Sequence, residues 1–90
     1  MSRLELRYVA HITTLTGRLV EMTQAEAGTL RELIAELDGR YPGFGSTFVD
    51  PQTGRLRFNV MIYYKEEGCD PITLTDIAHP IRDGSTVTFW

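Results

Sequence analysis

Cysteine is almost absent from this chain, which contains Cys69 alone among its 90 residues. A single thiol cannot close an internal disulfide, and no second Cys or suitably spaced His is present to complete a structural zinc site. The sequence also lacks any stretch near the roughly 18 apolar residues that a membrane-spanning helix needs, and no apolar run follows a basic N-terminus. We therefore expect a protein of the reducing cytoplasm.

Positively charged residues are also few in this sequence. Nine Lys and Arg residues face twelve Asp and Glu residues, which gives a formal net charge of −3. Arg55 and Arg57 alternate along a segment expected to be extended, but two arginines are more typical of a solvated face than of a phosphate clamp. We expect neither nucleic acid nor a membrane surface as the partner.

The remaining composition is that of a folded domain. Hydrophobic residues make up 42% of the chain and charged residues 23%, unlike a disordered segment. A chain of this length has room for one core, so we expect residues 1–90 to form a single domain. Small domains bury a smaller fraction of their surface, and contact with a partner would add stability.

The N-terminal third predicts a hairpin. Apolar residues occupy every second position of the first segment, the period of a strand with one buried face. They are Leu4, Leu6, Tyr8, Ala10 and Ile12. Thr16-Gly17 then predicts a turn, and a short second strand is expected from Arg18 to Thr23.

A helix is predicted next. Thr29 followed by Glu32 has the spacing of a capping box, which marks the first turn. An apolar stripe recurs at intervals of three and four residues, and it must cover a sheet. Its members are Leu30, Leu33, Ile34 and Leu37. Gly39 is expected to supply the left-handed residue past the last turn, and Pro42 prevents continuation, so the helix spans about eleven residues.

The C-terminal half predicts strands separated by turns. Asp50–Gly54 is a strong turn signal, and a strand rich in aromatic and β-branched residues is expected over Phe58–Tyr64. Ile72–Leu74 permits a very short strand, and Thr86–Trp90 the last one. Three aromatic residues in the loop after the helix either cap the core or form an exposed apolar patch, and we favour core capping: Tyr41, Phe44 and Phe48. The order of elements predicts an α+β domain with a mixed sheet of four to five strands covered by one main helix.

Candidate catalytic or metal-binding residues are few. Carboxylates and an imidazole gather near the C-terminus: Asp70, Asp76, His79 and Asp83. They lie in predicted turns, where Asp usually bonds nearby backbone, so we favour a structural role. His11 has no nucleophile placed beside it in the sequence, and no cation is evident to activate Cys69. We predict no catalytic residue, no metal and no cofactor, and hence no enzyme.

Short motifs distributed along most of the chain resemble one family, the small sulfur carriers of the MoaD/ThiS group. They are Thr16-Gly17, the helix start from Gly28 to Leu33, Arg40-Tyr41-Pro42-Gly43, Gly54 to Arg57, and His79 to Gly84. Each motif is weak alone, but they occur in the right order. The resemblance implies a β-grasp, ubiquitin-like fold. It also implies a carrier whose C-terminal Gly-Gly is adenylated and converted to a thiocarboxylate.

The sequence departs from that family at two places. The family continues past the last strand to Gly-Gly, whereas these residues stop at Trp90, and the loop Lys65–Asp70 is longer and more charged than the family's turn. We therefore expect a protein-docking module or accessory subunit without the sulfur-carrying tail. The alternative is a sulfur carrier for molybdopterin, thiamine or related biosynthesis, if the native chain extends to Gly-Gly.

Phe89 and Trp90 are the interface candidates. The resemblance implies that the aromatic position before the tail contributes to docking, and tryptophan is enriched at binding hot spots because it buries a large area at low entropy cost. The opposing interpretation is that Trp90 packs over the domain's own sheet. The implied partner is an adenylating enzyme or a molybdopterin-synthase-type catalytic subunit, with self-association as a further possibility.

Overall fold

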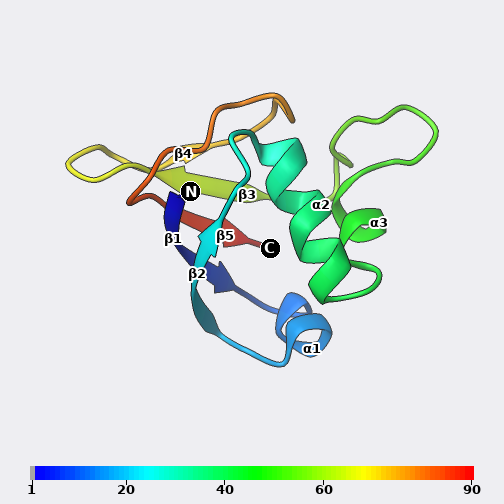
Figure 1. Cartoon of the computed structure of the whole chain (residues 1–90). Coiled ribbons are helices and arrows are strands. Elements are labelled where there is room, and N and C mark those ends of the chain that lie inside the picture. Colours follow the sequence, from blue (N-terminus) through cyan, green and yellow to red (C-terminus); the bar gives the residue numbers. More distant parts are fainter. Residues whose placement is uncertain (1) are drawn as a thin grey trace.

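Five strands form one mixed sheet in the order β2-β1-β5-β3-β4 in the computed structural model, which describes residues 2–90 (Figure 1). The strands are β1 (Ser2–Tyr8), β2 (Val20–Ala25), β3 (Ile62–Lys65), β4 (Ile72–Thr73) and β5 (Thr86–Phe89). The helices are α1 (Ile12–Thr16), α2 (Leu30–Arg40) and α3 (Phe44–Phe48). β5 runs parallel to β1, and the other pairings are antiparallel. The α+β prediction, with its mixed sheet and main helix, is confirmed.

The first two strands pair as predicted, but their bounds and connection differ. β1 ends at Tyr8, four residues before the expected end, because the chain leaves the sheet at Ala10 with a positive φ of 58°. Ile12 is buried from α1 rather than from the strand. Thr16-Gly17 is accordingly the end of a helical turn, in which the Gly17 amide donates to the Thr13 carbonyl at 2.7 Å. β2 begins and ends two residues later than predicted.

The capping box at the start of α2 is confirmed. The Glu32 amide donates to the Thr29 hydroxyl at 3.3 Å, while the Glu32 carboxylate accepts from the Gly28 amide at 3.0 Å. These bonds satisfy donors that a helix start leaves free. The predicted apolar stripe is buried against the sheet. Gly39 was expected beyond the helix, but it lies inside α2, which ends at Arg40 and is capped by Tyr41.

The strand predicted over Phe58–Tyr64 is largely wrong. The segment after α3 first pairs back on α3, since the Arg57 amide donates to the Phe48 carbonyl at 2.9 Å and the Arg57 Nε donates to the Ser46 carbonyl at 2.8 Å. The chain therefore reaches the sheet only at Ile62. Phe58 was expected at the start of this strand, but it lies outside β3 and is fully exposed.

The core lies between the sheet and α2, with α3 closing one end (Figure 1). Phe44 and Phe48, predicted in a loop, form α3 instead and are fully buried. Gly43 starts this helix with φ of 96°, a conformation that glycine adopts without strain. The core-capping role expected for the two phenylalanines is confirmed, and Tyr41 packs half-buried beside them.

Candidate docking surface

One face of the sheet is covered and the other is open. In β1 the alternate residues Leu4, Leu6 and Tyr8 are buried under α2. The residues between them point to the opposite face, as do their neighbours in β3 and β5. Over β1, β5 and β3 this open face is formed by Arg3, Glu5, Arg7, Tyr63, Lys65, Thr86 and Thr88, and it continues onto the outward side chains of β2. The helices α1, α2 and α3 leave this face available for contact.

A hollow of about 270 Å³ lies near the centre of the open face. Thr86 and Thr88 of β5 form its floor between β1 and β3. Charged groups flank it, because Arg7 pairs with Glu5 at 2.6 Å on one side and Lys65 lies on the other. A shallow floor of hydroxyls between mixed charges suits a protein surface better than a small apolar ligand.

An aromatic cluster stands at one end of this face, where β5 ends. The indole of Trp90 meets the ring of Tyr63 edge to face, with ring centroids 6.3 Å apart. The Trp90 amide donates to the Met61 carbonyl at 2.9 Å, which fixes the backbone at this position. Trp90 remains 42% exposed and Met61 46%. The cluster thus presents a partly exposed tryptophan on a rigid backbone.

Phe89 lies on the other side of the same strand. Its side chain is fully buried and packs against Phe44 and Phe48, with ring centroids 5.0 and 5.2 Å apart. It therefore has no surface to offer to a partner, and its role in this region is to anchor β5 in the core. Of the two residues proposed from the sequence, only Trp90 is placed where docking is feasible.

A buried carboxylate occupies the covered face at the edge of the sheet. Glu21 of β2 accepts hydrogen bonds from the Tyr8 hydroxyl at 2.8 Å and the Tyr41 hydroxyl at 2.7 Å. Arg40, at the end of α2, pairs with the same carboxylate at 2.6 Å and also donates to the Thr23 hydroxyl at 3.2 Å. This network fastens the end of α2 to β2.

The network changes the pKa of its members. Burial alone would raise the pKa of Glu21, but hydrogen bonds from Tyr41, Tyr8 and Arg40 outweigh it and hold the pKa below the ordinary 4.5. Burial, followed by the hydrogen bond to Glu21, raises the pKa of both Tyr8 and Tyr41 above 10.0. Glu21 is therefore a charged, fully partnered group with no free capacity as a general base.

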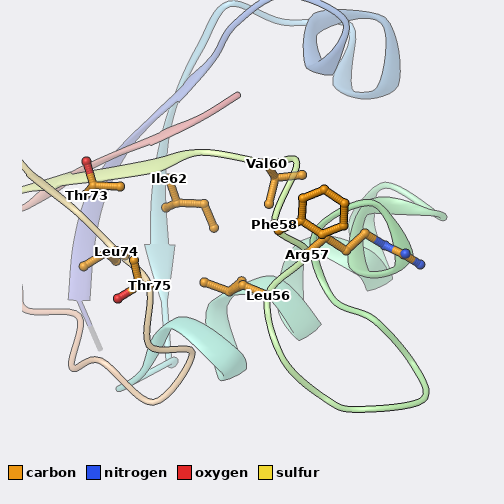
Figure 2. A pocket seen from close by; sticks show the side chains of 8 residues that line it. All are labelled: Leu56, Arg57, Phe58, Val60, Ile62, Thr73, Leu74 and Thr75. Atoms are coloured by element: carbon orange, nitrogen blue, oxygen red, sulfur yellow. The ribbon is translucent and has the colours of Figure 1, made fainter.

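A cavity of about 180 Å³ with a mixed lining of apolar and polar side chains opens beside β3 and β4. Figure 2 shows the side chains of Leu56, Val60, Ile62 and Leu74 turned toward one space, while Arg57 points away from it. Phe58 stands at the margin of this cavity. The lining holds no titratable side chain apart from Arg57, so the cavity offers no catalytic group.

Two of the residues considered for metal binding or acid–base chemistry, Asp76 and Asp83, take structural roles. The Asp76 carboxylate accepts from the Ala78 amide at 2.9 Å, and the Asp83 carboxylate accepts from the Arg3 amide at 2.7 Å. Within residues 2–90 no three potential ligands gather at one point. Over the same residues no helix is long and apolar enough to cross a membrane. Cys69 is an exposed free thiol in the loop before β4.

Two features of the site were missed by sequence reasoning. Tyr63 was not singled out, although a tyrosine in the outward phase of a strand beside the last strand is a visible signal. Glu21 was assigned to a strand without comment. The feature that could have identified Glu21 is an acidic residue at a position of β2 whose side chain points toward the core, directly opposite Leu6.

Comparison with known proteins identifies the fold. No family model and no curated protein sequence matches the chain, but solved structures match over nearly its whole length. Mycobacterium tuberculosis CysO is 25% identical with a TM-score of 0.77, covering 97% of this chain and 96% of that one. A chain of the BexX/CysO complex of Amycolatopsis orientalis is 19% identical with a TM-score of 0.75, covering 97% of this chain and 92% of that one.

A putative molybdopterin converting factor subunit 1 from Pyrococcus furiosus is 19% identical with a TM-score of 0.68, covering 99% of this chain and 95% of that one. These neighbours are small ubiquitin-like carrier and modifier proteins. The β-grasp prediction is confirmed, as is the resemblance to the MoaD/ThiS-like group.

Proposed function

We propose that this ubiquitin-like chain is a docking module that binds a larger protein through the open face of its sheet and Trp90. The observation that carries the proposal is the partly exposed Trp90–Tyr63 pair on a fixed backbone, beside a polar hollow. A large aromatic surrounded by polar groups is the usual composition of a binding hot spot and its rim.

The neighbours support a larger protein as the partner. One of them was solved as a complex of CysO with BexX, and another is described as a subunit of a converting factor. We propose an adenylating enzyme or a molybdopterin-synthase-type catalytic subunit as the partner. We also propose that residues 1–90 act as one domain and not as an enzyme. The free, exposed thiol of Cys69 supports a reducing, cytoplasmic location.

A sulfur carrier is the second candidate, and the carrier and modifier neighbours favour it. That activity requires adjacent terminal glycines, because an extended Gly-Gly can enter a narrow channel that side chains would block. The 90 residues contain no two adjacent glycines. The carrier proposal therefore depends on sequence beyond Trp90, and the intact mass of the product of the native gene tests it. A mass that includes a terminal Gly-Gly supports the carrier, whereas a mass that ends at Trp90 contradicts it.

The docking proposal is tested by calorimetric titration into each of the two purified partner enzymes from the same organism. We expect saturable binding to one of them. Trp90→Ala should weaken the affinity at least about tenfold, as hot-spot truncations do. Phe58→Ala is the matched control, because Phe58 is a fully exposed aromatic away from the open face.

Two results would contradict the proposal. Absence of binding to both enzymes would remove the partner class. Equal losses for Trp90→Ala and Phe58→Ala would show that the binding surface lies elsewhere, since only Trp90 belongs to the proposed contact. Circular dichroism of each variant should confirm that the fold is retained.

A further inference from the structure

The two edges of the sheet differ in how they are protected. β4, at one edge, has two residues and follows Pro71 directly, and both features discourage pairing with another strand. β2, at the other edge, has six residues and contains no proline. Its outward side chains are Val20, Met22 and Gln24, none of them charged. A long edge strand that has no proline and no charge among its outward side chains is open to strand addition.

The free backbone groups of β2 belong to the same three residues. The Tyr8 amide donates to the Leu19 carbonyl at 2.9 Å, which fixes the phase of the β1–β2 ladder. Because bonded pairs alternate in an antiparallel ladder, Glu21 and Thr23 direct their backbone groups toward β1. The amides and carbonyls of Val20, Met22 and Gln24 therefore point away from β1, outward from the edge of the sheet.

The sequence of this edge is complementary to itself in one register. If two copies of β2 meet antiparallel with Met22 opposite Met22, then Val20 falls opposite Gln24 and Arg18 opposite Glu26. Both charged residues are exposed. Each end of the pair then brings together opposite charges, and the apolar residues lie toward the centre. The same register directs free backbone groups at one another and allows about six new hydrogen bonds.

The one carboxylate within β2 does not oppose this pairing. An inward-pointing charge can protect an edge, and Glu21 occupies such a position. Here Arg40 and the two tyrosine hydroxyls already neutralise and saturate it. In the register centred on Met22, Glu21 faces Thr23 of the other copy rather than another carboxylate. Glu21 therefore does not supply the charge repulsion that protects other edge strands from pairing.

We infer that β2 pairs with β2 of a second copy of this chain across a two-fold axis at Met22, joining two sheets into one. The charge pattern favours a second copy over an unrelated peptide, because Arg18 and Glu26, which flank β2 on its two sides, carry opposite charges. β1 separates this edge from β5 and β3, which carry the Trp90–Tyr63 pair, so self-pairing and contact through that pair use different strands. A single strand pair buries less than a standard interface, so a weak dimer with a dissociation constant of about 0.1 mM is expected.

Sedimentation equilibrium between about 10 µM and 1 mM, spanning that constant, measures the dimer directly. The weight-average mass should rise from 10.2 kDa toward twice that value. In amide exchange by NMR, the amides of Val20, Met22 and Gln24 should gain protection as concentration rises. A mass that stays at 10.2 kDa through 1 mM would overturn the inference.

Charge exchange tests the register. Arg18→Glu alone places like charges opposite each other at both ends of the pair, and it should weaken dimerisation about tenfold. Glu26→Arg alone should do the same. The double variant restores opposite charges and should return the dissociation constant to within about twofold of the original. Failure of the double variant to rescue would exclude this register.

Met22→Lys provides a second test, because it places two ammonium groups at the two-fold axis. It should abolish the concentration dependence of the mass. Met61→Lys is the matched control, since Met61 is an exposed methionine beside the Trp90–Tyr63 pair and not in β2. Dimerisation that survives Met22→Lys, or that is lost with Met61→Lys, would place the contact elsewhere. The substituted residues are all exposed, so circular dichroism should show that each variant keeps the fold; they are Arg18, Met22, Glu26 and Met61.

Discussion

The two faces of the sheet are built from neighbouring residues of the same strands, yet they serve different purposes. Val87 and Phe89 of β5 are fully buried under the helices, whereas Thr86 and Thr88, which alternate with them, line the open hollow. The covered face holds nearly all of the apolar contact and its one carboxylate is saturated by donors. Folding free energy is thus concentrated on one face, which leaves the other available for the proposed docking.

The sharpest way to test this contrast is to compare adjacent residues. Phe89→Ala should lower the free energy of unfolding by about 3–5 kcal/mol, because it empties the centre of an aromatic cluster. Trp90→Ala, one residue on but on the open face, should cost less than about 1 kcal/mol. Urea denaturation measures both. Similar losses for the two variants would refute the assignment of the faces.

The next largest effect is expected at the carboxylate of β2. Glu21→Gln removes the charge that holds Arg40 and two tyrosine hydroxyls, and should cost about 2 kcal/mol. Glu5→Gln is the matched control on the open face, since its pair with Arg7 is exposed and should matter by less than about 0.5 kcal/mol. Equal effects would show that the covered network contributes nothing beyond a surface ion pair.

The same network predicts the pH dependence of stability. The pKa of Glu21 is lowered on folding, so its contribution is present above 4.5 and is lost as the pH falls through the lower folded value. The pKa values of Tyr8 and Tyr41 are raised, so their contribution is present below 10.0 and is lost at higher pH. Stability measured across pH should fall at both ends, and Glu21→Gln should flatten the acid side.

A smaller effect is expected at the start of the covering helix. Thr29→Ala removes the hydroxyl that accepts from the Glu32 amide, and should cost about 1 kcal/mol. Thr29→Ser keeps the acceptor and serves as the control. Thermal unfolding should rank the two variants in that order, and an unchanged midpoint for Thr29→Ala would show that the cap is dispensable.

The smallest effect on folding is expected in the hollow itself. Thr88→Lys should change the free energy of unfolding by less than about 0.5 kcal/mol, because Thr88 is half-exposed on the open face. Partner affinity should fall nevertheless, since an added cation would occupy the hollow. Calorimetry and urea denaturation on the same sample separate the two effects. A large loss of stability would mean that this face contributes to the core.

The predictability of each element followed the strength of its local signal. The capping box and apolar stripe of α2 are local patterns, and both were confirmed. The alternation of apolar residues from Leu4 to Ile12 gave a strand that was too long, because Ile12 is buried from α1 and not from the sheet. In Phe58–Tyr64, β propensity was overridden by non-local bonds of Arg57 to α3, which no local pattern reveals.

The sequence predicted an aromatic docking residue, but it did not predict which neighbouring residues are exposed. The sequence singled out Trp90, but the burial of Phe89 depends on the phase of β5 relative to β1, which is a tertiary property. The Glu21 network joins β1, β2, α2 and Tyr41, so it required the fold before its members could be brought together. The self-complementary charges around Met22 are visible in the sequence, but only the sheet order gives them meaning.

The position of β5 has a consequence for how the molecule is made. This strand is the last of the five along the chain, yet it lies at the centre of the sheet and joins β1 to β3. A growing polypeptide that has not yet released Phe89 from the ribosome can form the β1–β2 hairpin but cannot close the sheet. Because such long-range pairing comes late and slowly, we expect native structure to arise only after synthesis has passed Phe89.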